Sequence, residues 1–288
     1  MNRKIRLGSV LLAIALAAAG CQKRTQVAGV TLDVSFSEDA LSDNLITEVT
    51  YTWKTAGDFA KLDRDYSVFV HFWHNENMLF QDDYSPEPPT TKWEPGRTYT
   101  AKRRIYIPQF IDEFDPAFKG EETLRLSAGI YNPFDRSGTS SREVLSKKLK
   151  VVPPPLGTPE VIYESGWYDL EVNQDTVLKQ WRWTAKEARC VVDNPRRDAF
   201  LVIKGGANTE AVKDQKITFK INELTLDEFI AQEPLFDKSY EIKKEMLGDK
   251  DEFILTIAVD KPFIPAKMIP NSKDERELGL QVSFVYFR

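Results

Sequence analysis

The side chains best suited to binding chemistry lie in the second half of this sequence, where aromatic and charged residues stand close together. Trp181, Arg182 and Trp183 are consecutive, so on a strand both indoles point to one face and the guanidinium points to the other. Aromatic rings stack on the apolar faces of sugar rings, and guanidinium and carboxylate groups offer paired donors or acceptors to sugar hydroxyls. The candidate ligand-binding residues are Trp167, Trp181, Arg182, Trp183, Asp274, Arg276 and Glu277.

A structural interpretation of the same residues is also open. The indoles can fill the interior of a sheet sandwich, and Asp274 or Glu277 can form a salt bridge with Arg182 that closes it. Such a pair requires the first and last strands of this half to be neighbours, which would also bring Trp167 close. The exposure or burial of the tryptophans, Trp93 included, separates a binding surface from a purely structural role.

Few residues suit catalysis or metal binding. His71 and His74 are the only histidines, and positions i and i+3 of a strand face opposite sides, so these two need a turn between them to share an ion. The sequence has no Gly-x-Ser-x-Gly elbow. A glycan-active hydrolase would need two acids in one cleft, about 5–9.5 Å apart, and no such pair is evident. We therefore expect no catalytic residue, no cofactor and no metal, and a protein that is not an enzyme.

The elements that must position these residues are strands. From Val30 onward, apolar and polar residues alternate, as in Leu32, Asp33 and Val34, which is the period of a half-buried strand. Turns rich in Pro, Gly and Asp separate such segments. The predicted strands of the first half are 30–36, 46–53, 66–73, 99–107, 123–131 and 144–152. They indicate an immunoglobulin-like antiparallel β-sandwich over residues 30–152.

A proline-rich segment divides the sequence. Residues 153–159 contain four prolines, which remove backbone donors and favour an extended linker, so we place a domain boundary there. Residues 160–288 indicate a second, jelly-roll-like sandwich, and the predicted class is all-β with two tandem sandwiches. Residues 224–233 and 239–247 can each hold a short helix, although part of the latter also fits a strand. The remaining predicted strands are 161–167, 180–184, 200–204, 216–221, 253–259 and 280–287.

Two runs of residues resemble known modules. The motifs Phe69–Phe72, Gln81–Tyr84, Trp93–Gly96 and Ile105–Pro108 resemble a β-sandwich module of bacterial cell-envelope proteins, including soluble tails of membrane glycosyltransferases. The motifs Gly166–Tyr168, Trp181–Trp183, Asp198–Leu201 and Asp274–Gly279 are similar to jelly-roll domains attached to bacterial glycan-handling proteins. The first resemblance implies fold more than chemistry.

The beginning of the sequence is typical of an export signal. Arg3, Lys4 and Arg6 precede an apolar run from Leu7 to Ala19, followed by small residues of the kind a signal peptidase needs. A bilayer is roughly 30 Å thick and a helix rises 1.5 Å per residue, so this run is too short to span it. We interpret residues 1–20 as a lipoprotein signal peptide that is removed.

The residues around Cys21 resemble the lipobox of bacterial lipoproteins, with Ala18 in place of the more usual Leu. That resemblance implies that Cys21 becomes the first mature residue and carries acyl chains, palmitate among them, which hold the protein on a membrane. Residues 21–29 then form a lipidated tether. Gln22 at the next position favours the outer membrane.

Charge and cysteine content limit the partners. Removing residues 1–20 takes away three basic side chains and moves the formal net charge from −5 to −8, which argues against nucleic acid as a partner. Cys190 is the one cysteine besides Cys21, and its apolar surroundings predict a buried small side chain. The aromatic loop 108–120 is a candidate contact for envelope protein partners.

These patterns together predict a non-catalytic, lipid-anchored cell-envelope protein that binds carbohydrate or assists polysaccharide assembly. The alternative is a structural adaptor subunit of an envelope protein complex, with the same loop and the sheet edges as its contacts.

Overall fold

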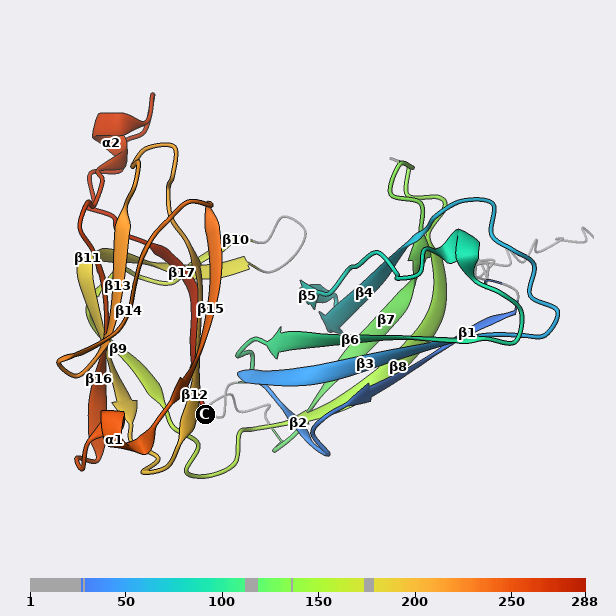
Figure 1. Cartoon of the computed structure of the whole chain (residues 1–288), viewed down its shortest axis with the longest axis horizontal. Coiled ribbons are helices and arrows are strands. Elements are labelled where there is room, and N and C mark those ends of the chain that lie inside the picture. Colours follow the sequence, from blue (N-terminus) through green and yellow to red (C-terminus); the bar gives the residue numbers. More distant parts are fainter. Residues whose placement is uncertain (1–26, 28, 112–118, 136, 174–178) are drawn as a thin grey trace, which may run out of the picture.

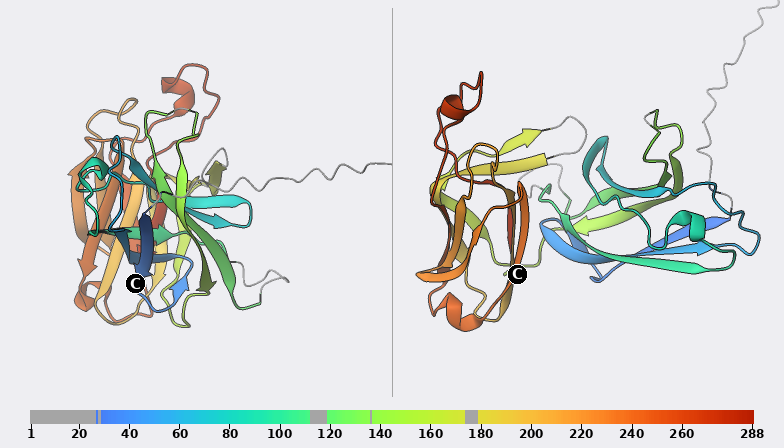
Figure 2. Two further views of the ribbon diagram at one scale, coloured as in Figure 1. Left: turned by 90° about the vertical axis from the view of Figure 1, so that its right-hand side faces the viewer. Right: turned by 45° about the horizontal axis from the view of Figure 1, so that its top comes forward.

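The computed structural model describes residues 27, 29–111, 119–135, 137–173 and 179–288. These residues form antiparallel sheets, and the helices among them are no more than short turns of three or four residues. The predicted all-β class is therefore confirmed. Figures 1 and 2 show the strands gathered into two sandwiches, joined through the segment that follows β8.

The first sandwich packs a three-stranded sheet of order β1-β3-β6 on a five-stranded sheet of order β2-β8-β7-β4-β5. Its strand pairs are antiparallel, apart from the parallel contact of β2 with β8. The three-stranded sheet contains β1 (Val30–Phe36), β3 (Leu45–Thr55) and β6 (Thr98–Ile107). The five-stranded sheet contains β2 (Leu41–Ser42), β4 (Ser67–His74), β5 (Asn77–Gln81), β7 (Glu122–Tyr131) and β8 (Arg142–Val152), and a 3-10 turn, η1, spans Thr90–Lys92.

Large aromatic side chains fill the first sandwich because alternation points every second residue inward. Trp53 on β3 and Trp93 after η1 are almost fully buried, and their ring centroids lie 5.6 Å apart. Tyr99 on β6 also stacks on Trp93, with ring centroids 5.0 Å apart. Trp93 therefore belongs to the core and does not offer a surface for a ligand.

Among the described residues, nine strands form the second sandwich. Seven of them follow one hydrogen-bonded path, β14-β13-β16-β11-β17-β12-β15, and β9 and β10 also pair with β11. In chain order, the first four strands of this sandwich are β9 (Val161–Trp167), β10 (Glu171–Asn173), β11 (Lys179–Asp193) and β12 (Ala199–Gly206). The strands that follow them are β13 (Lys216–Ile221), β14 (Leu224–Ile230), β15 (Leu235–Ile242), β16 (Glu252–Val259) and β17 (Gln281–Phe287). The short helices are α1 (Lys244–Leu247) and α2 (Pro265–Met268).

Strand β11 belongs to both layers of this sandwich. Residues 187–193 pair with β16, whereas Arg182 and Trp183 pair with β17. Between these halves the ladder with β9 shifts register, and Gly166 lies at that shift with φ 74°. A Cβ at Gly166 would lie 1.9 Å from the carbonyl oxygen of Glu187, so only glycine fits.

The expected helix over 224–233 is wrong. These residues contain strand β14, which pairs with β13. Phe229 packs edge-on against Phe219 at 5.6 Å and against Phe236 at 5.8 Å. The first contact joins the neighbouring strands β14 and β13, and the second reaches β15 at the other end of the strand path. Such tertiary packing overrides local helix propensity. Within 239–247, the strand continues to Ile242 and only the following α1 turn is helical.

The two sandwiches contact each other through outward-facing side chains. Tyr106 on β6 stacks on Phe284 of β17, with ring centroids 3.8 Å apart. Val202 and Tyr286 are only 2% and 5% exposed, yet they lie outside the core cluster of their own sandwich. Whether residues 30–152 and 160–288 fold independently stays a prediction, and residues 153–159 between them form neither helix nor strand.

We expect Gly166→Ala to destabilise the second sandwich by more than about 3 kcal/mol, because the new methyl group collides with the backbone of β11. Gly248→Ala is the matched control. Gly248 has the same φ of 74° but no atom within 4 Å of a built Cβ, so it adds backbone strain alone, about 1–2 kcal/mol. Urea unfolding followed by tryptophan fluorescence measures both variants. Equal losses would contradict the collision.

Candidate functional site

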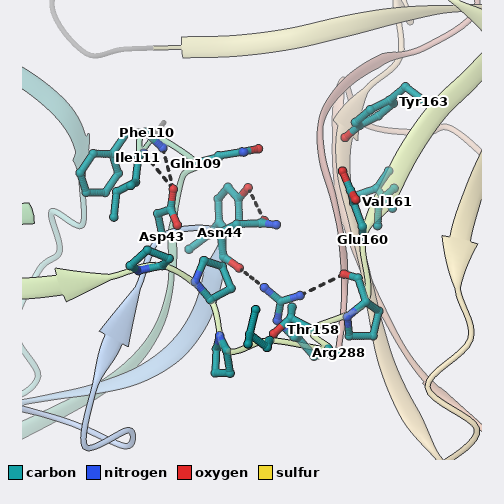
Figure 3. A pocket seen from close by; sticks show the side chains of 18 residues that line it. Asp43, Asn44, Gln109, Phe110, Ile111, Thr158, Glu160, Val161, Tyr163 and Arg288 are labelled. Carbon is teal, nitrogen blue, oxygen red and sulfur yellow. Dashed lines mark hydrogen bonds between the residues drawn. The ribbon is translucent and has the colours of Figure 1, made fainter. Parts of the chain in front are cut away.

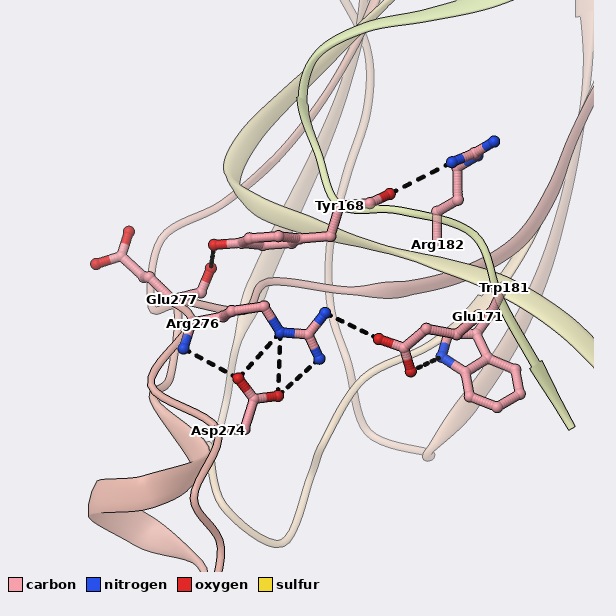
Figure 4. Close-up of polar contacts among 7 residues, drawn as sticks. All are labelled: Tyr168, Glu171, Trp181, Arg182, Asp274, Arg276 and Glu277. Carbon is pink, nitrogen blue, oxygen red and sulfur yellow. Dashed lines mark hydrogen bonds and ion pairs between the residues drawn. The ribbon is translucent and has the colours of Figure 1, made fainter.

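Arg276 is the centre of the cluster that the sequence analysis singled out (Figure 4). Its Nη2 donates to Oδ2 of Asp274 at 2.7 Å, and its Nε donates to Oδ1 of the same carboxylate at 3.0 Å. Its Nη1 donates to Oε1 of Glu171 at 2.9 Å. The guanidinium is therefore clamped between an acid of its own turn and an acid on β10.

Two aromatic side chains extend this cluster. The guanidinium carbon of Arg276 lies 5.1 Å from the centroid of the Tyr168 ring, and the Tyr168 hydroxyl donates to the backbone oxygen of Glu277 at 3.0 Å. The indole Nε1 of Trp181 donates to Oε2 of Glu171 at 3.1 Å. Asp274, Arg276, Glu171 and Trp181 thus form one continuous hydrogen-bonded chain. We call these four residues and Tyr168 the Arg276 cluster.

The Arg276 cluster is open to solvent. The side chains of Arg276, Glu171 and Asp274 are 36%, 33% and 27% exposed, and Trp181 and Tyr168 are half-buried. The bonds from Arg276 hold the pKa of Asp274 below its usual value, and the two carboxylates raise the pKa of Arg276. The positive charge of Arg276 is thus compensated by two carboxylates, while the edges of the guanidinium and carboxylate groups stay accessible to solvent.

One expected contact is wrong. Arg182 does not pair with Asp274 or Glu277 in the described part of the chain. Because Arg182 pairs in register with the core residue Val282, it points inward. There its guanidinium carbon lies 4.9 Å from the centroid of the Tyr163 ring.

Strand order explains why Arg182 does not meet the 274–277 turn. The first and last strands of the second sandwich, β9 and β17, are not hydrogen-bonded partners, because both pair with β11, which lies between them. The condition for bringing Arg182, Trp167 and the 274–277 turn together is therefore not met.

The other two tryptophans of the predicted site make separate contacts. Trp167 donates its Nε1 to the backbone oxygen of Arg189 at 2.9 Å and meets Tyr163 edge-on at 4.8 Å. Trp183 meets Phe263 edge-on at 5.9 Å. The structure therefore brings together Trp181, Asp274, Arg276 and the backbone of Glu277. The side chains of Trp167 and Trp183 lie outside this chain of contacts. Arg182 reaches it only through its Nη1, which donates to the backbone oxygen of Tyr168 at 3.4 Å.

Sequence reasoning missed Tyr168 and Glu171. Tyr168 directly follows a selected tryptophan, so its type and position were a usable signal. Glu171 has no such signal, because its role depends on the β10–β11 register that places it opposite Trp181. Register is a tertiary property that the spacing of residues along the chain does not give.

A larger cavity lies where the two sandwiches meet (Figure 3). Its volume is about 880 Å³, and its lining includes Tyr106, Tyr163, Arg288 and the linker residues 153–159. Arg288 donates its Nη2 to the backbone oxygen of Asn44 at 2.9 Å and its Nη1 to that of Pro159 at 3.2 Å. Burial raises the pKa of Tyr163 to about 12. These groups tie the sandwiches to each other and to the linker.

The described start of the loop 108–120 also lines this cavity. The backbone amides of Phe110 and Ile111 donate to Oδ2 of Asp43 at 3.0 and 2.9 Å, and Asp43 is only 2% exposed. Residues 112–118 lie outside the described residues. The proposed contact of this loop with envelope protein partners stays a prediction.

The histidines and Cys190 do not form a site. His71 Nε2 lies 3.5 Å from Oδ1 of Asp83, and His74 Nε2 lies 3.2 Å from Oε2 of Glu122. Within the described ranges, no three His, Cys, Asp or Glu side chains are grouped to hold a metal ion. Cys190 is buried, as expected, and burial raises its pKa to about 12, which keeps the thiol protonated and unreactive.

We expect Asp274→Asn to lower the melting temperature at pH 7, because the amide keeps the shape but loses the charge that pairs with Arg276. The pKa of Asp274 is depressed below 3.8, so its stabilising effect is present above the unfolded-state pKa and is lost as pH falls through the folded-state pKa. Thermal unfolding from pH 7 to pH 2 should show the gap from wild type closing in that acid range. Asp249→Asn, at an exposed position away from the cluster, is the control. A gap that stays constant with pH would contradict a charge effect.

Comparison with known proteins gives no assignment. No protein-family model matches the sequence, and no curated protein matches it. Among solved structures, the secreted serine protease VesC from Vibrio cholerae aligns over 90% of this chain and 51% of its own, with 10% identity and a TM-score of 0.24. Carbohydrate-binding modules of the β-sandwich superfamily, described for promiscuous specificity, align over 91% of this chain and 96% of theirs, with 11% identity and a TM-score of 0.18.

A third structure, the CBM51-2 and INT domains of Clostridium perfringens ZmpB, aligns over 58% of this chain and 39% of its own, with 12% identity and a TM-score of 0.20. This chain therefore spans only about half, or less, of the first and third of these structures. At such low TM-scores the matches carry no functional assignment. Among the described residues, no helix has the length and apolar character needed to cross a membrane.

Proposed function

We propose that this protein is a non-catalytic, lipid-anchored protein of the bacterial outer membrane that binds carbohydrate at the Arg276 cluster. The observation that carries the proposal is the indole of Trp181, which is half-exposed and held by its hydrogen bond to Glu171 beside an open guanidinium–carboxylate pair. An aromatic face next to such planar polar groups matches the alternation of apolar faces and hydroxyl edges on a sugar ring.

The shape of the cluster supports a glycan ligand over an enzyme substrate. Its groups lie on an open surface, and the carboxylates of Glu171 and Asp274 both hydrogen-bond to Arg276. Arg276 holds the pKa of Asp274 below its usual value, so this carboxylate stays ionised and does not serve as a general acid. The cluster can therefore hold a ligand without supplying a proton to it.

An adaptor role is the second candidate, and a different observation favours it. Apolar side chains are exposed on β14 and β15, which end the strand path of the second sandwich. Leu224, Ile230 and Leu235 are 53%, 42% and 76% exposed. Exposed apolar residues on end strands suit contact with another protein.

The glycan proposal predicts that Trp181→Ala lowers affinity for an envelope polysaccharide about tenfold, because loss of one stacking ring costs about 1.4 kcal/mol. Arg276→Ala should weaken binding as well, since it releases Glu171 and with it the orientation of Trp181. Trp73→Ala, at a half-buried position in the first sandwich, is the matched control. Glycan-array binding followed by titration measures all variants, with circular dichroism to establish folding.

Two results would contradict this proposal. If folded Trp181→Ala binds like wild type, the site is misassigned. If wild type binds no envelope polysaccharide on the array, the adaptor role becomes the better explanation.

Lipid anchoring has its own test, because Cys21 lies outside the described residues. We expect Cys21→Ala to abolish incorporation of labelled palmitate and to release the protein from the membrane fraction, since the thiol is the acylated group. Labelling in cells expressing wild type or variant, followed by membrane fractionation, measures both effects. Equal labelling of the two proteins would exclude this anchor.

A further inference from the structure

A second, smaller pocket lies beside Trp183 on the same sandwich. Its volume is about 280 Å³, and it is lined by residues of β11, β12 and β17 and by the loops that follow β12 and precede β15. The lining residues that carry the argument are Trp183, Gly206, Asn208, Thr209, Leu235 and Gln281. This is near the lower end of the roughly 300–1,000 Å³ range of small-molecule sites, a size that suits a ligand as small as one sugar ring.

Strand register builds the floor of this pocket. Gln281 on β17 pairs with Trp183 on one side and with Gly206 on the other, so the three residues form a row across three strands. A Cβ at Gly206 would lie 2.9 Å from the backbone oxygen of Pro234 and 3.8 Å from Oε1 of Gln281. The missing side chain at Gly206 therefore lets the Pro234 carbonyl approach the floor of the pocket closely.

Apart from Glu210, the polar side chains of the pocket are neutral and have free hydrogen-bonding capacity. Within the described residues, the Gln281 amide and the Thr209 hydroxyl make no side-chain hydrogen bond. Asn208 uses its Oδ1 to accept from the Ala211 amide at 3.0 Å, which leaves its NH₂ group free. Amides and hydroxyls that both donate and accept match the hydroxyls of a sugar, which do the same.

Charge at the pocket disfavours an acidic ligand. Glu210 is the one ionisable side chain in its lining, and it is exposed. No cation of the lining could compensate a uronate or a phosphate, and the single carboxylate would repel either. The ligand class that fits is a neutral sugar.

The pocket is close to the Arg276 cluster along β11. Trp181 and Trp183 are two residues apart on one face of this strand, a separation of about 7 Å. One glycan chain can therefore contact both indoles. Trp183 is half-buried and rests edge-on against Phe263, so its orientation is fixed before a ligand arrives.

We propose that the Trp183 pocket is a second subsite that takes one neutral sugar ring of a chain whose neighbouring part stacks on Trp181. This inference rests on the proposed glycan-binding function and adds the ligand class and a specificity-determining residue, Gln281. The Gln281 amide bonds the hydroxyls of the ring in the pocket, while Trp183 covers one of its apolar faces.

The test is calorimetric titration with hexasaccharides of different charge: cellohexaose, maltohexaose and N-acetylchitohexaose as neutral probes, and hexagalacturonate as the acidic probe. Gln281→Leu keeps the size of the side chain but removes the amide, so affinity for the best neutral probe should fall about tenfold. Gln81→Leu, the same substitution at an exposed position of β5 in the first sandwich, should leave affinity unchanged. Trp183→Phe should lower affinity less than Trp181→Ala does.

The outcomes separate this inference from the proposed function. If Trp181→Ala lowers affinity but Gln281→Leu and Trp183→Phe bind like wild type, the second subsite is wrong while glycan binding stands. If hexagalacturonate binds more tightly than every neutral probe, the ligand class is overturned. If no probe binds wild type and the glycan array is also negative, the proposed function fails and this subsite fails with it.

Discussion

The second sandwich depends on the close packing of β11 where it passes from one layer to the other. Two glycines make that passage possible: Gly166 lies against the Glu187 carbonyl, and a Cβ at Gly279 would lie 2.5 Å from both the Ala185 carbonyl oxygen and the Thr184 hydroxyl. Thr184 in turn accepts a hydrogen bond from the Leu280 amide at 2.9 Å. Backbones this close leave no room for side chains, so the two halves of β11 are held at a set orientation.

The candidate site follows from that constraint. Since the first half of β11 is held against β17, its outward face carries Trp181 and Trp183 while Arg182 turns inward to Tyr163. Strand β10 then pairs with the same half and places Glu171 opposite Trp181. The segment between β16 and β17 delivers Arg276, which closes the chain of contacts through Glu171. Two consecutive strands, β10 and β11, therefore meet a segment that lies 105 residues from Glu171 in the chain, because one strand serves both layers.

What the sequence could predict is what local patterns encode. Period-two alternation placed most strands. The consecutive residues Trp181, Arg182 and Trp183 correctly implied that the two indoles lie on one face of the strand and the guanidinium on the other. Both predictions depend only on neighbouring residues. The strand β14 was missed because the packing of Phe229 against Phe219 and Phe236 is a tertiary effect. The partner of Arg276 on β10 was missed for the same reason, since Glu171 is 105 residues away in the chain and only strand register brings it there.

The internal pairing of the Arg276 cluster also bears on how strongly it can bind. Arg276, Asp274 and Glu171 already satisfy one another, so a ligand gains edge hydrogen bonds and ring stacking but no new ion pair. A site that is already ordered loses little conformational entropy on binding, yet a few neutral contacts give modest affinity per molecule. In the proposed function, many copies held on one membrane would meet a repeating polysaccharide together, and their combined attachment would exceed that of any single site. Weak single sites on an anchored protein would also dissociate one at a time. The array of proteins would then stay bound to the polysaccharide while the polysaccharide moves.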